Sequence, residues 1–194
     1  KIFELMFKAD LLLWLIPKNN SIRFITSKEE KSASKLNIKR KLEFLESRSS
    51  IRQVLSNLLN IEPLKVPLNA NYGAIPNIPS ELGFISLSHC DKAILIGWSR
   101  FKLGVDIEKN KRNINADKLM KRYYFPKEIR KIQQIENYSN LKSNVLSYWV
   151  LKEAVIKLKQ GSIAKDLLNW EIDIDRELAF NSKMKINSYI KKIL

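Results

Sequence analysis

The sequence predicts an α+β protein with two roughly equal halves. Short apolar or alternating runs, which are typical of strands, occur near the start, in the middle and near the end of the chain. Tracts without glycine or proline, with apolar residues three and four positions apart, separate these runs and predict helices. The 194 residues are 45% hydrophobic, which is enough to bury a core and argues against disorder.

Three strands are predicted in the first half of the chain. The apolar run over residues 11–16 ends at Pro17, as expected of a buried strand. The runs over 84–89 and 93–98 are apolar or alternating, and only three residues separate them. Such a short connection indicates a β-hairpin.

A long helix and a loop are predicted between the first strand and the hairpin. Neither glycine nor proline occurs from residue 28 to residue 60, and leucines recur at helical spacing over 42–59. This pattern predicts an amphipathic helix. Four of the six prolines fall within residues 61–83, which are therefore expected to form a loop.

The second half is expected to contain helices followed by strands. Residues 116–136 and 143–159 have helical patterns, and Gly161 is placed to cap the second helix. Strict alternation predicts a strand over 170–175, and a shorter alternating run predicts another over 183–186.

Two acidic residues are predicted to share one face of a further strand. Residues 103–108 alternate after Gly104, so Asp106 and Glu108 are expected to project together. Taken alone, this pair is typical of solvated acidic residues at a strand end.

The chain is strongly basic, with a formal net charge of +15 and a pI of about 9.8. This excess favours an anionic partner, but charge alone does not separate nucleic acid, acidic protein and a phosphorylated small molecule. The chain is also rich in Lys, Asn and Ile, a composition that genomic bias produces without selection for binding. Both interpretations stay open at this point.

Cysteine and histidine usage limits the covalent and metal chemistry. The single cysteine, Cys90, excludes an intramolecular disulfide, and one Cys with one His cannot form a zinc cage. Any metal must therefore be held by oxygen ligands. Charges interrupt the apolar stretch over residues 2–16, which is too short to span a bilayer and lacks a signal-cleavage pattern, so a cytoplasmic protein without membrane attachment is expected.

A second set of polar residues lies on the helix predicted over 143–159. Trp149, Glu153 and Lys157 are four residues apart and share one face, with Lys152 beside Glu153. A Glu four residues before a Lys is a common surface pair worth about 0.3–0.5 kcal/mol, so the spacing alone indicates a structural role. A catalytic or binding role is indicated only when this helical set is taken together with the two strand carboxylates and an upstream Ser-His.

Four motifs, in this order along the chain, carry a resemblance to a known family. They are Ser86-Leu87-Ser88-His89, Gly104-Val105-Asp106-Ile107-Glu108, the run from Arg122 to Glu128, and the run from Trp149 to Lys157. Together they resemble the 4′-phosphopantetheinyl transferase superfamily, specifically its surfactin-type branch with two halves in one chain. The resemblance covers most of residues 42–175.

The resemblance implies an enzyme that transfers the 4′-phosphopantetheine arm of coenzyme A to a serine of an apo acyl or peptidyl carrier protein. The other product would be adenosine 3′,5′-bisphosphate. The acceptor would belong to fatty-acid, polyketide or peptide synthesis. The fold implied is a pseudo-dimer of two similar α+β halves with the active site between them, and a monomer is expected.

Metal and catalytic roles follow from the same resemblance. Asp106, Glu108 and Glu153 are the implied ligands of Mg²⁺, a hard cation that suits an all-oxygen set and would neutralise the pyrophosphate. Glu153, directly or through a metal-bound water, is the implied base for the serine hydroxyl. Lys157 is expected to stabilise charge on the transferring phosphate, and Lys152 is a further candidate for this role.

Contacts with coenzyme A phosphates are implied for Arg48, Ser88 and His89, together with Lys152 and Lys157. Arg52 is expected to be structural. The chain departs from the family pattern at Ala74, where a basic residue usually contacts the nucleotide. Either Lys65 or another nearby lysine substitutes for it, or coenzyme A binds with one fewer contact.

The implied domains are residues 1–100, which would supply the coenzyme A phosphate contacts, and residues 101–194, which would supply the metal and catalytic groups. Lys118, Lys121 and Arg122 are expected to steer an acidic carrier protein. A basic nucleic-acid-binding module without catalysis is the alternative, but it leaves the carboxylate motifs unexplained. A non-catalytic carrier-binding relative is a third interpretation, and the intact acidic residues speak against it.

Overall fold

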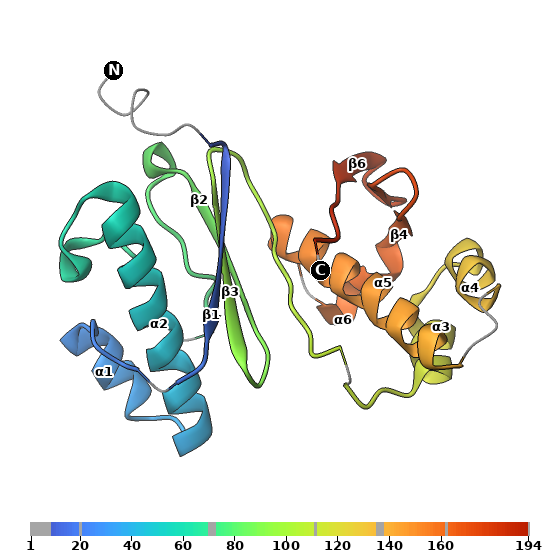
Figure 1. Ribbon diagram of the computed structural model, residues 1–194. Helices are drawn as coiled ribbons and strands as arrows, with labels where there is room; N and C mark the ends of the chain where they lie inside the picture. The colour runs from blue at the N-terminus through green and yellow to red at the C-terminus, as the bar shows by residue number, and fades with distance from the viewer. Residues whose placement is uncertain are drawn as a thin grey trace. The chain divides into compact units, whose positions relative to one another are not determined.

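The computed structural model describes residues 9–19, 21–69, 73–110, 112–134, 138–161 and 163–193. The chain divides into two compact units, Lys1–Leu103 (unit 1) and Gly104–Leu194 (unit 2). Within these described ranges, each unit contains one three-stranded antiparallel sheet and one long helix (Figure 1). The strand order is β1-β3-β2 in unit 1 and β4-β5-β6 in unit 2. The α+β class is confirmed, whereas similarity between the two halves stays a prediction.

The sheet of unit 1 contains all three strands predicted for the first half. β1 covers Leu11–Pro17, β2 covers Phe84–His89 and β3 covers Ala93–Ser99. Trp14 of β1 and Leu87 of β2 both pair with Ile96 of β3. Paired residues project to the same face of a sheet, and these three side chains belong to the core of unit 1.

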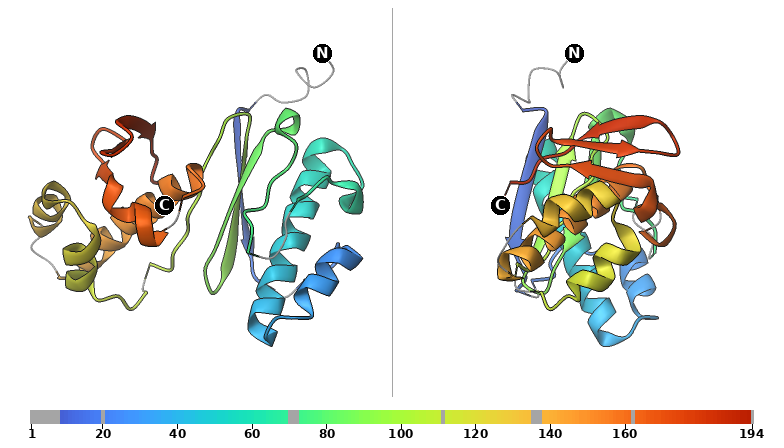
Figure 2. Two further views of the ribbon diagram at one scale, coloured as in Figure 1. Left: turned by 180° about the vertical axis from the view of Figure 1, so that it is seen from behind. Right: turned by 90° about the vertical axis from the view of Figure 1, so that its right-hand side faces the viewer.

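One helix, α2, covers that face of the sheet, and α1 packs against α2 (Figure 2). α1 covers Ser27–Ala33 and α2 covers Ile38–Leu59. α2 begins one turn before the helical pattern recognised over residues 42–59. The side chain of Asn37 accepts a hydrogen bond from the backbone N–H of Arg40 and caps the helix at this earlier position. The apolar side chains of α2 pack with those of the sheet, and the predicted loop contains two short 3₁₀ turns, η2 (Pro63–Lys65) and η3 (Ser80–Leu82).

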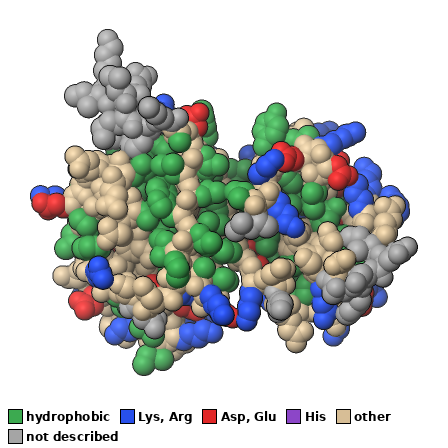
Figure 3. Space-filling model, in the orientation of Figure 1, with side chains coloured by type: hydrophobic (Ala, Val, Ile, Leu, Met, Phe, Trp, Pro, Cys, Tyr) green, Lys and Arg blue, Asp and Glu red, His purple; other side chains and the backbone are tan. Residues whose placement is uncertain are grey.

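The other face of β1 presents three leucines to its surroundings. Leu11, Leu13 and Leu15 alternate with the core-facing residues and are 52%, 36% and 53% exposed. Figure 3 shows apolar side chains gathered over the part of unit 1 that contains β1. The alternating pattern of a half-buried strand is therefore masked in the sequence, because both faces of β1 are apolar.

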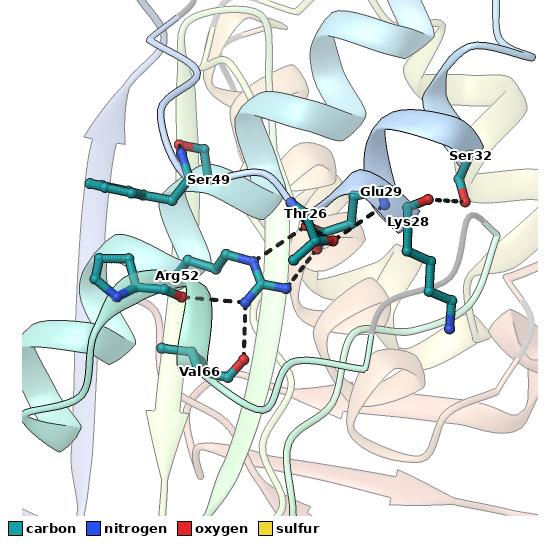
Figure 4. A network of polar contacts seen from close by, with 9 residues as sticks. Thr26, Lys28, Glu29, Ser32, Ser49, Arg52 and Val66 are labelled. Atoms are coloured by element: carbon teal, nitrogen blue, oxygen red, sulfur yellow. Dashed lines mark hydrogen bonds and ion pairs between the residues drawn. The ribbon is translucent and has the colours of Figure 1, made fainter.

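A buried ion pair joins α1 to α2 in unit 1 (Figure 4). The guanidinium of Arg52 donates to the carboxylate of Glu29, with an Nη2–Oε1 distance of 3.1 Å. It also donates to the carbonyls of Pro63 and Val66, at 3.3 and 3.0 Å. Hydrogen bonds from Thr26 and Arg52 lower the pKa of Glu29 despite its burial, which alone would raise it. These contacts give Arg52 the structural role expected from the sequence.

Replacing Arg52 with Ala is expected to lower the free energy of unfolding by about 3–5 kcal/mol, because the carboxylate of Glu29 would stay buried without its cation. Chemical denaturation measures this change. Arg40→Ala is a matched control, since Arg40 is an exposed residue of the same helix, and a change within about 0.5 kcal/mol is expected there. Equal losses for both variants would contradict the assignment.

Unit 2 is built around one long helix, α5 (Tyr138–Leu158), which contacts α3, α4 and β4 (Figure 1). The other elements of unit 2 are α3 (Ala116–Tyr123), α4 (Pro126–Gln133), α6 (Ile163–Asp166), the 3₁₀ turn η4 (Leu167–Asn169), β4 (Trp170–Asp173), β5 (Leu178–Asn181) and β6 (Ile186–Tyr189).

Three predictions for the second half need correction. The helix predicted over 116–136 is two helices, because Pro126 starts α4 and the residue before a proline is driven to extended backbone. The strand predicted over 183–186 is a turn as far as Lys185, and β6 begins only at Ile186. The sequence analysis did not predict β5. Residues 103–108 form no strand: this described segment is irregular and has no ladder partner.

Among the described residues, no helix has both the length and the apolar character needed to cross a bilayer.

Candidate active site

The candidate site of unit 2 is formed by α5 and the segment over residues 104–108. Gly104 lies directly against α5, so a Cβ atom at this position would overlap the carbonyl oxygen of Ala154 and lie 2.5 Å from the backbone N of Leu158. Glycine is therefore required for the close approach of the two backbones. Val105 is buried, and the segment continues past the face of α5 that carries Glu153 and Lys157.

The close approach places Asp106 beside Lys157. Nζ of Lys157 donates to Oδ1 of Asp106 at 2.5 Å. The side chain of Asp106 is 3% exposed and that of Lys157 is 28% exposed, so water screens this pair only partly. The structure thus joins two of the predicted site residues, which are 51 positions apart in the sequence.

Glu108 is paired with a cation that the sequence analysis did not single out. Its carboxylate accepts a hydrogen bond from Nη1 of Arg112. Burial, with a contribution from the negative charge of Asp106, raises the pKa of Glu108, although Arg112 opposes this shift.

Glu153 has the most perturbed carboxyl group of the site. Burial raises its pKa to about 7, and the negative charges of Asp106 and Glu108 add to the shift, while Lys157 opposes it. The indole N–H of Trp149 lies toward Glu153 and lowers its pKa slightly, but it does not complete a hydrogen bond of normal geometry. Near neutral pH the carboxyl group is therefore poised to accept or release a proton.

The three carboxylates suit a hard cation in chemistry but are not gathered around one point. The negative charge of Asp106 contributes to the raised pKa values of Glu108 and Glu153, and the donor atoms of all three side chains are oxygens, as Mg²⁺ prefers. Within the described residues, however, no three acidic, histidine or cysteine side chains stand close enough to hold a metal ion together. Lys157 and Arg112 pair with two of the carboxylates. The ligand set therefore stays a prediction.

Lys152 lies in the core of unit 2. Its side chain is 0% exposed, its Nζ is 3.0 Å from Oε2 of Glu128, and it donates to the carbonyl of Trp170. Burial lowers the pKa of Lys152 and raises that of Glu128, and the attraction between the two opposes both shifts. These contacts lie within the core of unit 2, and the coenzyme A contact that the resemblance implies for Lys152 stays a prediction.

The remaining site residues predicted from the sequence lie in unit 1. Ser88 and His89 end β2, where Ser88 is buried and His89 is exposed. Arg48 lies on α2 with 5% exposure, and its guanidinium is 4.6 Å from the centroid of the Phe44 ring. Burial lowers the pKa of Arg48 to about 10. Ala74 is exposed. The coenzyme A contacts assigned to Arg48, Ser88 and His89 stay predictions.

A cleft of about 400 Å³ lies in unit 2, beside α3. Its apolar lining includes Leu119, Leu146 and Trp149, and its cationic lining comprises Arg112, Lys118 and Arg122. Arg112 also binds Glu108, and Trp149 lies one turn before Glu153 on α5, so the cleft adjoins the candidate site. Lys121, which the sequence grouped with Lys118 and Arg122, is exposed and is not part of the lining.

Comparison with known proteins identifies relatives of the region that contains this site. Residues 102–191 match the model of the 4′-phosphopantetheinyl transferase superfamily. The chain is also similar to the 4′-phosphopantetheinyl transferase HetI of Nostoc sp. (strain PCC 7120 / SAG 25.82 / UTEX 2576), with 27% identity over 128 residues. This alignment covers 63% of the chain and 53% of HetI, so the chain spans about half the length of that curated relative.

The matched region includes Asp106, Glu108, Glu153 and Lys157, the residues that the structure brings into one electrostatic neighbourhood. Through residues 102–191, the chain is thus similar to the 4′-phosphopantetheinyl transferase superfamily.

Proposed function

We propose that the protein transfers the 4′-phosphopantetheine arm of coenzyme A to a serine of an apo acyl or peptidyl carrier protein. The observation that carries this proposal is Glu153, a half-buried carboxyl group with a pKa of about 7, beside the Asp106–Lys157 pair in the region that matches the family. A carboxyl group with this pKa is suited to accept a proton from a hydroxyl at neutral pH.

In the proposed reaction, the serine oxygen attacks the β-phosphorus of coenzyme A. A bond forms between the serine oxygen and this phosphorus, and the pyrophosphate P–O bond breaks to release adenosine 3′,5′-bisphosphate. A carboxylate oxygen of Glu153 takes the serine proton, directly or through a water molecule. The ammonium of Lys157, which donates to Asp106, would stabilise charge on the transferred phosphoryl group.

Mg²⁺ is the proposed metal, and Asp106, Glu108 and Glu153 would hold it. When bound, the ion supplies charge neutralisation at the pyrophosphate. Glu153 is needed both as ligand and as base, so the two duties compete for one side chain. Arg48, Ser88 and His89 are the proposed contacts for coenzyme A phosphates. A surfactin-type chain with two similar halves is the proposed architecture.

Intact-mass spectrometry of an apo carrier protein, incubated with this chain, coenzyme A and Mg²⁺, tests the function. We expect the carrier to gain the mass of one phosphopantetheine arm. Asp106→Asn removes a charge beside both Glu153 and Lys157, and it is expected to reduce the rate at least about 100-fold. No mass gain with the unaltered chain across several acidic carrier proteins would exclude the proposal.

The cleft beside α3 is the proposed docking surface for the carrier protein, because its cationic rim complements an acidic partner. Lys118→Glu is expected to lower kcat/KM for the carrier about 10-fold at low ionic strength, with a smaller effect at high salt. Stopped-flow or discontinuous rate assays at two salt concentrations measure this. Lys183→Glu, in the turn between β5 and β6 and outside the cleft lining, makes the same charge change and should alter the rate less.

A further inference from the structure

A buried ion pair joins three elements of unit 2 behind the candidate active site. Lys152 of α5 and Glu128 of α4 both have side chains that are 0% exposed, with 3.0 Å between Nζ and Oε2. The ammonium of Lys152 also donates to the carbonyl of Trp170, the first residue of β4. The pair therefore links α5 to α4 and to β4.

Both charges have further partners. The carboxylate of Glu128 accepts hydrogen bonds from the backbone N–H groups of Phe125 and Ile172, each at 2.7 Å. The ammonium of Lys152 lies 5.4 Å from the ring centroid of Tyr124 and 5.1 Å from that of Phe125. A buried charge pair with this many partners restricts the elements that carry them, because any movement would leave a charge uncompensated.

The neighbour of Lys152 on α5 is Glu153, and successive helical residues point about 100° apart. Lys152 points into the core of unit 2, so Glu153 is directed to the side where Asp106 influences it. The backbone of Gly104 contacts the same helix at Ala154 and Leu158. Two contacts on different sides of α5 thus fix its rotation and its distance from residues 104–108.

We propose that the Lys152–Glu128 pair is a positioning device that fixes the orientation of Glu153 and Lys157, and that Lys152 does not contact coenzyme A. The inference rests on the proposed function only for its kinetic test, since the structural link is measurable without activity. Lys152 acts through Glu128 and the helix, so its loss is expected to change kcat and leave KM for coenzyme A unchanged.

A double-mutant cycle separates a positioning role of Lys152 from a direct contact with coenzyme A. Lys152→Met keeps the volume of the side chain but leaves Glu128 charged and buried, so the melting temperature of the full chain is expected to fall by about 10 °C. Hydrogen exchange of the α5 backbone should accelerate in the same variant. Adding Glu128→Gln removes the unpaired charge and retains an acceptor for a backbone N–H, so the double variant should recover at least half of the lost melting temperature.

The kinetic arm uses the double variant, which stays measurable even where Lys152→Met alone fails to fold. We expect kcat to recover together with stability, and KM for coenzyme A to stay within about twofold of the unaltered chain. Lys157→Met, on the same helix, is the comparison for a side chain of the site, and it should reduce activity without a comparable loss of stability. A KM for coenzyme A that stays raised 10-fold in the double variant would overturn the proposal, as would wild-type stability of Lys152→Met.

Discussion

Replacing Glu153 with Gln is expected to reduce phosphopantetheine transfer by about 10²–10⁴-fold and, at the same time, to stabilise the metal-free protein at pH 8. Activity is expected to fall because, in the proposed mechanism, Glu153 takes the serine proton and an amide cannot accept it. The stability rises because the folded chain holds the Glu153 carboxylate at a cost, which its raised pKa of about 7 reflects. The same residue is thus predicted to favour catalysis and oppose folding.

The sign of the stability change depends on pH. The pKa of Glu153 is about 7 in the folded chain, against an ordinary value of 4.5. The folded state therefore binds the proton of this group more tightly than the unfolded state does, and the protonated group favours folding at low pH. That contribution disappears as the pH rises from about 4.5 to 7, where the carboxyl group ionises in the folded state. A shift of this size corresponds to at most about 3 kcal/mol, and solvent at the half-buried side chain reduces the expected gain for Glu153→Gln to about 1–2 kcal/mol at pH 8.

Urea denaturation at pH 5 and pH 8, in the presence of a chelator, measures this difference. The advantage of the Gln variant should be present at pH 8 and smaller at pH 5. Glu177→Gln is the control, because Glu177 is an exposed member of a surface pair with Lys191 and its loss is worth less than about 1 kcal/mol. A Gln variant at position 153 that is less stable than the unaltered chain at pH 8 would contradict the electrostatic description of the site.

Much of the secondary structure could be predicted from local patterns, and the exceptions have identifiable causes. The hairpin of β2 and β3 follows from two apolar runs with a three-residue connection, and α2 follows from its helical spacing. The alternation of residues 103–108 has a different origin. One side of this segment packs against α5, so an alternating pattern arises without any strand partner.

The sequence named candidate site residues, whose roles stay predictions, but it did not reveal the surroundings of these side chains. The motifs named Asp106, Glu153 and Lys157, and the structure brings their charges together. The sequence did not show that Lys152 points inward. Lys and Glu are both usually exposed, so two adjacent charged residues on a helix do not reveal which of them faces the core. The start of α4 did have a signal in the sequence. Pro126 followed by an acidic residue, Glu128, is typical of the first turn of a helix, where the carboxylate accepts from the backbone N–H of Phe125.

The second large effect is expected for Gly104→Ala, which adds a single methyl group. A Cβ atom at this position would overlap the carbonyl oxygen of Ala154 and lie 2.5 Å from the backbone N of Leu158. Both neighbours are backbone atoms of α5, so no side-chain movement can make room. The segment over 104–108 must therefore move away from the helix, which takes Asp106 away from Lys157 and Glu153.

We expect Gly104→Ala to lose at least about 100-fold in kcat/KM, because displacement of a site group by about 1 Å has an effect of this size. The free energy of unfolding should fall by about 1–3 kcal/mol from overpacking. Gly161→Ala is the matched control in the same unit. There the added Cβ meets mainly the carboxylate end of Asp166, a flexible side chain that can turn aside, so activity should be retained. If Gly104→Ala kept full activity, the close approach of residues 104–108 to α5 would not be what assembles the site.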